Sequence, residues 1–223
     1  MDGTALAEKR DEALHCRACP LWADATQTVF GEGPAGAAAM FVGEQPGDQE
    51  DRQGRPFVGP AGQLFDRALA EAGIDRALTY VTNAVKHFKF ELRGRRRIHQ
   101  KPLYKEVLAC KPWLEAEIEL VAPRLLVALG ATAAQALKGR AVTIGKERGR
   151  WQDYPGGRRL LVTVHPSYLL RLPDERAQAV EYRRFVDELG LVVDALRDAP
   201  AGAAPSAPRR RKSTEDGGQF SLF

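Results

Sequence analysis

Four short apolar runs constrain the fold of this chain more than any other feature of its sequence. They are almost free of polar side chains, and they span residues 37–42, 78–82, 124–129 and 159–163. Strands that are buried on both faces of a parallel sheet have this composition. Helical periodicity follows or separates the runs at residues 61–72, 103–121, 131–138 and 174–197. The pattern predicts an α/β fold: a three-layer α/β/α sandwich around a central, mainly parallel four-stranded sheet with right-handed crossovers.

The composition indicates one folded domain and a polar tail. Of 223 residues, 44% are hydrophobic, which is enough for a substantial core within residues 1–197. Residues 198–223 are rich in Ala, Pro, Gly, Ser and charge, and we expect this basic tail to be disordered. No run approaches the roughly 20 apolar residues of a membrane span, and no signal peptide is recognisable. We expect a cytoplasmic monomer without a membrane partner.

The placement of the basic residues is more informative than the formal net charge, which is only +4. Basic clusters at residues 93–97 and 209–212 suit a polyanion. The first cluster lies in ELRGRRRIHQKP, residues 91–102, which shows neither helical nor strand periodicity and contains His99. A solvated basic loop is the ordinary interpretation of such a run, and it leaves the histidine unexplained.

Three cysteines indicate a possible metal site. Cytosolic thiols remain reduced, so Cys16, Cys19 and Cys110 are not expected to form disulfides, and the Cys16-x-x-Cys19 pair becomes a metal-ligand or redox candidate. A thioredoxin-like pair would begin a helix after a strand, whereas this pair follows a polar helical stretch at residues 4–15 and precedes Pro20. Metal binding is therefore the better interpretation.

A four-ligand site with three cysteines needs a histidine. His15 adjoins Cys16 and is poorly placed to share a metal with it, so His87 is the stronger candidate. The expected ligands are the three cysteines and His87.

Polar residues follow the predicted strands where open parallel sheets bind ligands, beyond the carboxyl ends of the strands. Glu44, Asn83 and His165 each follow a strand, and His99 lies in a long connection after the second one. Singly, they could be a loop carboxylate, a turn residue, a helix cap and a loop contact. Their shared position predicts one site at this edge.

Several stretches together resemble a known family. GEQPG, GRPFVGPAGQLFD, TNAV and HPSYLLR are similar to the motifs of the uracil-DNA glycosylase superfamily, closest to its iron–sulfur family four, over about residues 16–190. The resemblance implies a uracil-DNA glycosylase-like fold, excision of uracil from DNA, and a [4Fe-4S] cluster held by Cys16, Cys19, His87 and Cys110. Zinc is the alternative metal.

Two departures resemble the UdgX-type branch of this superfamily. NAVKH places His87 where family four has cysteine, and the insertion that ends in RRRIH resembles a loop whose histidine becomes covalently joined to DNA. The resemblance therefore implies that His99 bonds to C1′ of the abasic sugar and that the protein acts once. A conventional hydrolytic glycosylase and a non-catalytic iron–sulfur module that binds nucleic acid are the alternatives.

The chemistry of base excision assigns roles to these residues. Phe57 is a stacking platform or, alternatively, a core residue, and the Asn83 amide can match O4 and N3–H of uracil. His165 can donate to uracil O2 as charge accumulates there. Glu44 would orient water, stabilise the sugar cation or orient His99.

The basic segment would contact the DNA backbone. Arg97 and its neighbours are expected to position the loop against phosphates and to hold His99 at the sugar. The other residues expected to contact uracil or DNA are Gly43, Gln45, Gly47, Asp48, Arg96, Ser167 and Arg171.

The partners expected from the resemblance are uracil-containing DNA, single-stranded DNA above all, and a sliding clamp. The last five residues, QFSLF, resemble the peptide by which bacterial repair proteins bind the clamp, through Gln219, Leu222 and Phe223. The resemblance implies a bacterial protein that associates with the nucleoid when it acts.

Overall fold

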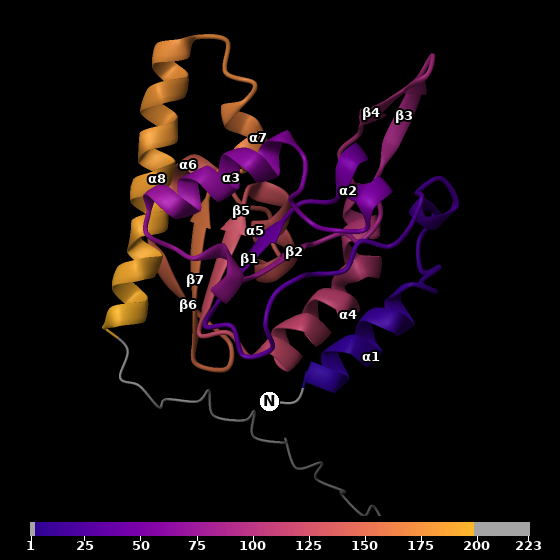
Figure 1. Cartoon of the computed structure of the whole chain (residues 1–223), viewed down its shortest axis with the longest axis horizontal. Coiled ribbons are helices and arrows are strands. Elements are labelled where there is room, and N and C mark those ends of the chain that lie inside the picture. The colour runs from indigo at the N-terminus through magenta and orange to yellow at the C-terminus, as the bar shows by residue number, and fades with distance from the viewer. Residues whose placement is uncertain (1–2, 199–223) are drawn as a thin grey trace, which may run out of the picture.

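A five-stranded sheet in the order β2-β1-β5-β7-β6 forms the centre of the molecule (Figure 1). The computed structural model describes residues 3–198, so all but the first residue of the predicted tail, with the clamp peptide, lies outside the described residues. The strands are β1 (Ala39–Gly43), β2 (Tyr80–Asn83), β5 (Leu125–Leu129), β6 (Trp151–Tyr154) and β7 (Arg158–Thr163). All are parallel except β6, which pairs antiparallel with β7.

Helices cover both faces of this sheet. One layer consists of α1 (Gly3–Ala13), α4 (Tyr104–Val121) and α5 (Ala131–Lys138). The other consists of α3 (Pro60–Glu71), α7 (Pro166–Leu169) and α8 (Glu175–Arg197). Short elements connect them: η1 (Pro20–Ala23), α2 (Asp48–Gln53), η2 (Arg76–Leu78) and α6 (Ile144–Glu147). The predicted α/β/α sandwich is confirmed.

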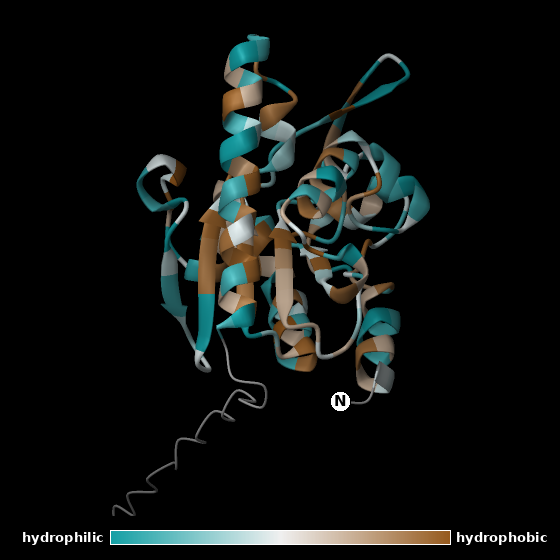
Figure 2. Cartoon of the chain, turned by 60° about the vertical axis from the view of Figure 1, so that its left-hand side comes forward, coloured by the Kyte–Doolittle hydropathy of each residue, from teal (hydrophilic) through white to brown (hydrophobic). Residues whose placement is uncertain are grey.

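The central strands are apolar throughout because each has a helical layer on both sides. Met40 and Val42 of β1 pack in the cluster with α1, α4 and α5, whereas Phe41 packs in the cluster with α3, α7 and α8. All three side chains are fully buried. Figure 2 shows the apolar strands between helices whose outer faces are polar. No helix in the described part of the chain has the length and apolar character to cross a membrane.

The sequence did not predict three strands. β6 is the fifth strand, and it lies at an edge where its residues are half-exposed and partly polar, so it lacks an apolar run. β3 (Phe90–Arg93) and β4 (Arg96–His99) form a separate antiparallel hairpin in the basic segment, which is therefore not an irregular loop. The hairpin stands away from the sheet and most of its residues are exposed, so burial imposes no apolar alternation on it (Figure 1).

Candidate active site

The structure brings the four predicted polar residues to one cleft. Glu44 follows β1, Asn83 ends β2, His165 follows β7, and His99 ends β4 of the hairpin. Two adjoining cavities occupy the cleft. The inner pocket, about 370 Å³, has Phe57 and Asn83 in its wall, and the outer pocket, about 730 Å³, has Glu44. Five residues line both: Gln45, His99, His165, Ser167 and Arg171.

Phe57 forms a wall of the inner pocket in a strained backbone conformation. Its φ is +57°, which a bulky residue seldom adopts and which marks functional sites when the surroundings hold it. The ring is 5% exposed, with its centroid 5.3 Å from Phe65 and 5.9 Å from the stacked ring of His165. A Cβ at Gly43 would lie 2.6 Å from the Phe57 ring and 2.3 Å from Oδ1 of Asn83. Only glycine at position 43 allows this approach.

Asn83 offers a free amide to the inner pocket. The residue is 2% exposed, and its side chain forms no hydrogen bond with any described residue. The backbone carbonyl of Asn83 accepts a 2.7 Å hydrogen bond from Lys86 Nζ, and Lys86 forms a fully buried ion pair with Glu117 at 2.5 Å. Burying such a pair costs desolvation energy. The hydrogen bond from Lys86 to the Asn83 backbone carbonyl fixes the end of β2. Sequence reasoning missed this pair.

His165 is the N-cap of α7, and its tautomer follows from its partners. The backbone N–H of Ser167 donates to His165 Nδ1 at 3.1 Å, so Nδ1 is unprotonated and Nε2 carries the hydrogen in the neutral ring. Arg171 in turn donates to the Ser167 hydroxyl at 3.1 Å. Burial lowers the pKa of His165 to about 4. The cleft therefore contains a neutral imidazole with an N–H donor.

Glu44 is held between the body and the hairpin. The Thr132 hydroxyl at the start of α5 donates to Oε2 of Glu44, and Oε1 lies 3.6 Å from Nε2 of His99. The Glu44 side chain is 23% exposed. One carboxylate oxygen is thus anchored, and the other lies near His99, which lines both pockets.

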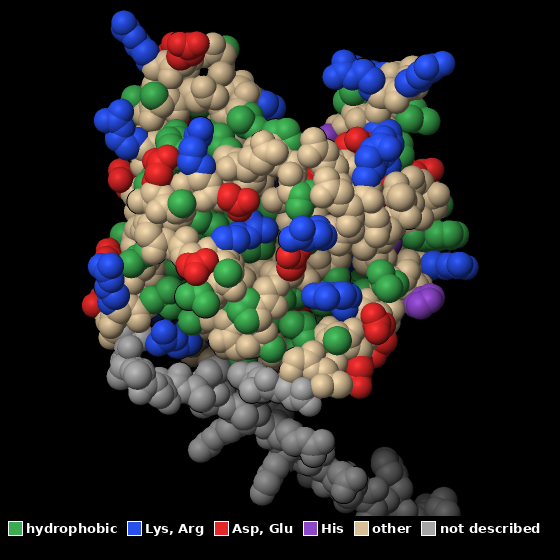
Figure 3. Space-filling view, viewed as in Figure 1, with side chains coloured by type: hydrophobic (Ala, Val, Ile, Leu, Met, Phe, Trp, Pro, Cys, Tyr) green, Lys and Arg blue, Asp and Glu red, His purple; other side chains and the backbone are tan. Residues whose placement is uncertain are grey.

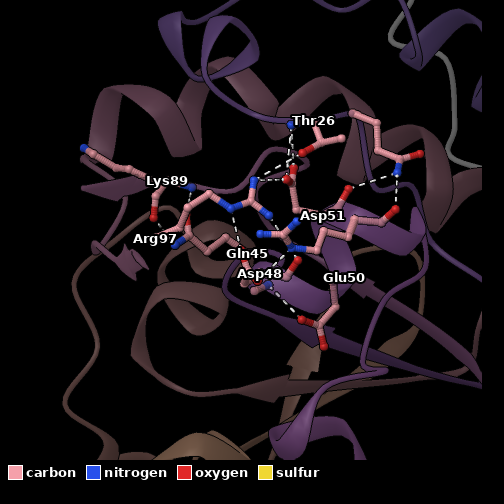
Figure 4. A network of polar contacts seen from close by, with 10 residues as sticks. Thr26, Gln45, Asp48, Glu50, Asp51, Lys89 and Arg97 are labelled. Atoms are coloured by element: carbon pink, nitrogen blue, oxygen red, sulfur yellow. Dashed lines mark hydrogen bonds and ion pairs between the residues drawn. The ribbon is translucent and has the colours of Figure 1, made fainter. Parts of the chain in front are cut away.

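Gln45 connects the loop after β1 to the base of the hairpin (Figure 4). Its Oε1 accepts the Lys89 N–H at 3.1 Å, which fixes the orientation of the amide, and its Nε2 donates to the Gln100 carbonyl at 2.9 Å. The same Nε2 lies 2.8 Å from His99 Nε2, so the His99 nitrogen accepts and carries a lone pair. Partial desolvation in the cleft lowers the pKa of His99, which favours the neutral ring. Gln45 therefore orients His99, in addition to lining the cleft.

Arg97 corrects the expectation of a phosphate contact, because its guanidinium points into the protein (Figure 4). It pairs with Asp48 and, at 2.6 Å, with Asp51, a fully buried residue of α2. It also lies over the rings of Phe88 and Phe90, at 5.4 and 5.0 Å. A buried carboxylate must be paired, and Arg97 meets that need. Arg97 thus fastens the hairpin to α2, and Asp48 is its partner.

Two further residues expected to contact DNA are Arg96 and Gly47. Arg96 is exposed on the hairpin, as the expectation requires. The Gly47 N–H donates at 3.1 Å to the Glu50 carboxylate, which also accepts the Gly59 N–H at 2.7 Å. Glu50 therefore holds two glycine loops of the inner pocket together, a role that sequence reasoning did not assign.

The three cysteines are buried and form no disulfides. The thiols of Cys19 and Cys110 interact, which lowers the pKa of Cys19 to about 6 and raises the pKa of Cys110. Trp113 Nε1 donates to Cys16 Sγ at 3.1 Å. Within residues 3–198, no three His, Cys, Asp or Glu side chains are spaced to hold a single metal ion. Zinc gains no support from this spacing, whereas the ligands of a cluster bind different irons.

His87 fits a metal ligand because one of its nitrogens is buried without a partner. The Thr28 hydroxyl donates to the Ala13 carbonyl at 2.9 Å, so its oxygen must accept from His87 Nε2, 3.0 Å away. The hydrogen is then on Nε2, and Nδ1 is a buried nitrogen with a free lone pair. Histidine ligands are commonly fixed in this way through their second nitrogen. The residues present therefore fit a cluster with His87 as fourth ligand.

Comparison with known proteins identifies the relatives of this chain. Residues 30–190 match the model of the uracil DNA glycosylase superfamily. The type-4 uracil-DNA glycosylase of Thermotoga maritima is 45% identical over 78% of this chain and 84% of the relative. The type-4 uracil-DNA glycosylase of Saccharolobus solfataricus is 37% identical over 80% and 83%, and that of Sulfurisphaera tokodaii is 32% identical over 84% and 86%.

Proposed function

This chain belongs to the uracil-DNA glycosylase superfamily, and we propose that it excises uracil from DNA as the type-4 members do. One observation carries the proposal: the free Asn83 amide, the Phe57 ring and the His165 donor line a single pocket at the carboxyl edge of the sheet. The pocket has the groups that a flipped uracil requires, a stacking surface and a donor–acceptor pair for its edge. Cytosine presents the opposite pattern, so an amide held in the orientation that matches uracil would leave buried groups unpaired, at a cost of about 1–3 kcal/mol each.

Cleavage separates a uracil anion from a sugar with oxocarbenium character. The Nε2–H of His165 donates to the uracil oxygen on which charge accumulates, without protonation of the ring. Glu44 presents Oε1 toward the space where the sugar lies, while Thr132 holds Oε2. Its carboxylate stabilises the positive charge on the sugar and can orient a water molecule.

The fate of the sugar has two candidates. Hydrolysis, in which Glu44 directs water to C1′, is the outcome that similarity to three type-4 glycosylases supports. Capture by His99 is the second candidate, and the position of this ring favours it. His99 lines both pockets, and its Nε2 lone pair lies 3.6 Å from the Glu44 carboxylate.

The capture reaction balances without another reactant. The bond from C1′ to N1 of uracil breaks, and its electron pair leaves with the base. The lone pair of His99 Nε2 exchanges the Gln45 hydrogen bond for a bond to C1′. The resulting imidazolium loses the Nδ1 proton to water, and uracil takes up a proton. An N-alkylated imidazole is a poor leaving group, so this reaction would occur once per protein.

A denaturing gel distinguishes these candidates. The protein is incubated with single-stranded DNA that contains one uracil, and a thymine-containing strand is the control. A band that survives boiling in detergent and disappears in His99→Ser supports capture, whereas alkali-sensitive DNA without such a band supports hydrolysis. Intact DNA in both treatments would overturn glycosylase activity and leave a binding module. A band that persists in His99→Ser would exclude His99 as the nucleophile.

The cluster belongs to the same proposal. Cys16, Cys19, His87 and Cys110 would hold a [4Fe-4S] group, which fastens the N-terminal segment to the loop between Asn83 and the hairpin. The support is the buried lone pair of His87 and the similarity to the type-4 glycosylases. A visible absorption spectrum with an iron and zinc analysis of the purified protein tests it. Zinc without iron would contradict it.

The proposal extends to the partners of the protein, its location in the cell and its division into a folded domain and a tail. Residues 1–197 would act in the bacterial cytoplasm on uracil-containing DNA, and residues 219–223 would bind the sliding clamp. Deletion of residues 219–223 should abolish clamp binding and leave excision on short oligonucleotides unchanged. Equal clamp binding by the intact and truncated proteins would refute the clamp proposal.

A further inference from the structure

The outer pocket continues the cleft beyond the place of the flipped base. It is about twice as large as the inner pocket, at 730 Å³ against 370 Å³. His99 and His165 line both, so the sugar of a bound uracil would lie where the two pockets meet. A single base would fill the inner pocket, and a volume in the range of small-molecule sites would remain beyond the sugar.

The outer pocket has an apolar floor and an aromatic rim. Leu129 and Val164 are buried in its floor, and Ile144 of α6 lies beside them. Tyr168 of α7 lines the pocket and is 40% exposed. None of the ring–ring or cation–ring contacts in the described part of the chain involves Tyr168, so no other aromatic ring or cation in that part stacks on it.

Two cations of the outer pocket are not neutralised. Lys101 follows the hairpin, Arg171 follows α7, and neither has an ion pair with any residue between 3 and 198. Arg184, by contrast, is held by Glu188 at 3.3 Å. In Figure 3 the molecule is notched between the hairpin and the region of α7 and α8, and Lys and Arg side chains stand on both sides of the notch. A phosphate that crosses the notch would meet positive charge from both walls.

We propose that the outer pocket binds the nucleotide adjacent to uracil on the same strand, in an unpaired state. Its base would stack on Tyr168 above the apolar floor, and the phosphate between the two nucleotides would lie near Arg171 and Lys101. A base enclosed in this way cannot keep its Watson–Crick partner, so the pocket selects single-stranded DNA. This inference rests on the proposed function, because uracil in the inner pocket sets the register of the strand.

Binding to modified strands tests the subsite. The probe is a short single strand with 2′-fluoro-deoxyuridine, which resists cleavage, and a tetrahydrofuran abasic residue either 5′ or 3′ to it. The abasic residue keeps the phosphates and removes the base. Stacking of a base on an aromatic side chain contributes about 1–3 kcal/mol, so loss of the neighbouring base on one side should raise Kd roughly fivefold or more. Equal Kd values for both abasic strands and the unmodified strand would overturn the proposal.

Substitutions at Tyr168 assign the effect to the outer pocket. Tyr168→Leu should weaken binding of the unmodified strand about as much as the abasic neighbour does, and the two changes together should add nothing further. Tyr168→Phe keeps the ring and is the matched control. Additive losses would place the neighbouring base elsewhere and contradict the proposal. If Tyr168→Leu does not fold, the Kd values of the wild-type protein for the abasic strands still test whether the neighbouring base is bound.

The failure of this inference is distinguishable from failure of the proposed function. If the wild-type protein excises uracil from DNA but its Kd is insensitive to the neighbouring base, only the subsite is refuted. If it excises uracil from no strand, the proposed function is refuted.

Discussion

His165 and His99 face the same cleft from two regions of unlike construction. His165 caps α7, stacks on Phe57, and has its Nδ1 within hydrogen-bond distance of the backbone N–H and the hydroxyl of Ser167. The His99 side chain is 49% exposed, and it ends a hairpin that lies outside the sheet. The comparison teaches that the groups proposed to bind the base are fixed by the main body of the fold, whereas the position of His99 depends on a few polar contacts.

Those contacts are made by β4 and by the segment that enters the hairpin. Arg97 of β4 binds Asp48 and Asp51 of α2, and Lys89 binds Glu106 of α4 at 2.9 Å. On the opposite strand, Leu92 is the cross-strand partner of Arg97 and is 65% exposed, with charged neighbours. The hairpin is therefore anchored through the strand that carries His99, whereas most of β3 is exposed.

The largest expected effect comes from the body of the fold. His165→Leu removes the Nε2–H donor and keeps the side chain apolar, so excision under single-turnover conditions should fall by about 10²- to 10³-fold. The measurement is the formation of alkali-sensitive sites in uracil-containing single-stranded DNA. A loss below tenfold would mean that His165 does not stabilise the departing base.

Arg97→Met removes the ion pairs that fasten the hairpin to α2. The Asp51 carboxylate would remain buried without its partner, so the free energy of unfolding should fall by about 3 kcal/mol. Arg96→Met, one residue earlier on the exposed side of the same strand, should change it by less than about 0.5 kcal/mol. Denaturant unfolding measures both proteins, and equal losses would show that Arg97 does not anchor the hairpin.

Thr28→Val tests the link between the cluster ligands and the loop that precedes the hairpin. The substitution removes the acceptor that keeps hydrogen on Nε2 of His87, so retention of the iron–sulfur group should weaken by about 10- to 100-fold. Thr28→Ser restores the hydroxyl and should restore retention. Iron content and visible absorbance after exposure to a chelator provide the readout. Unchanged retention of the iron–sulfur group in Thr28→Val would show that Thr28 does not orient His87 as a ligand.

The last expected effect is a pH dependence of stability that reports on His165. The folded protein protonates this ring only near pH 4, whereas the ordinary value is 6.5, so acid favours the unfolded chain. As the pH falls from 6.5 to 4, the unfolding free energy of wild type should decrease by up to about 1.4 kcal/mol per pH unit relative to that of His165→Leu. Unfolding midpoints of both proteins across this range provide the test. Parallel pH curves would contradict the burial of a neutral ring.

The fold and the body side of the cleft could be predicted because burial imposes a pattern. β1 and β5 are buried on both faces, so their residues are uniformly apolar, and the carboxyl ends of parallel strands meet at one edge. The presence of Glu44, Asn83 and His165 at that edge follows from topology alone.

The hairpin and its contacts could not be predicted in the same way. Its strands are largely exposed, and the only local signal was Gly94, which has a φ of +60° in the turn between Arg93 and Arg96. The direction of Arg97 depends on Asp51, which is distant in sequence and fully buried only in the folded chain. Sequence identifies a charge, and the fold decides whether it faces DNA or an acid.

Counting the uracil released tests the central claim most directly. Wild-type protein with its cluster is mixed with an excess of uracil-containing single-stranded DNA, and free uracil is measured to completion beside the Asn83→Leu variant. The account predicts at least one equivalent of free uracil per wild-type molecule. It predicts release slower by about 10²-fold or more from Asn83→Leu, which lacks the amide that would bind the edge of uracil. No free uracil from wild type, or equal release by both proteins, would contradict the claim that this cleft recognises and excises the base.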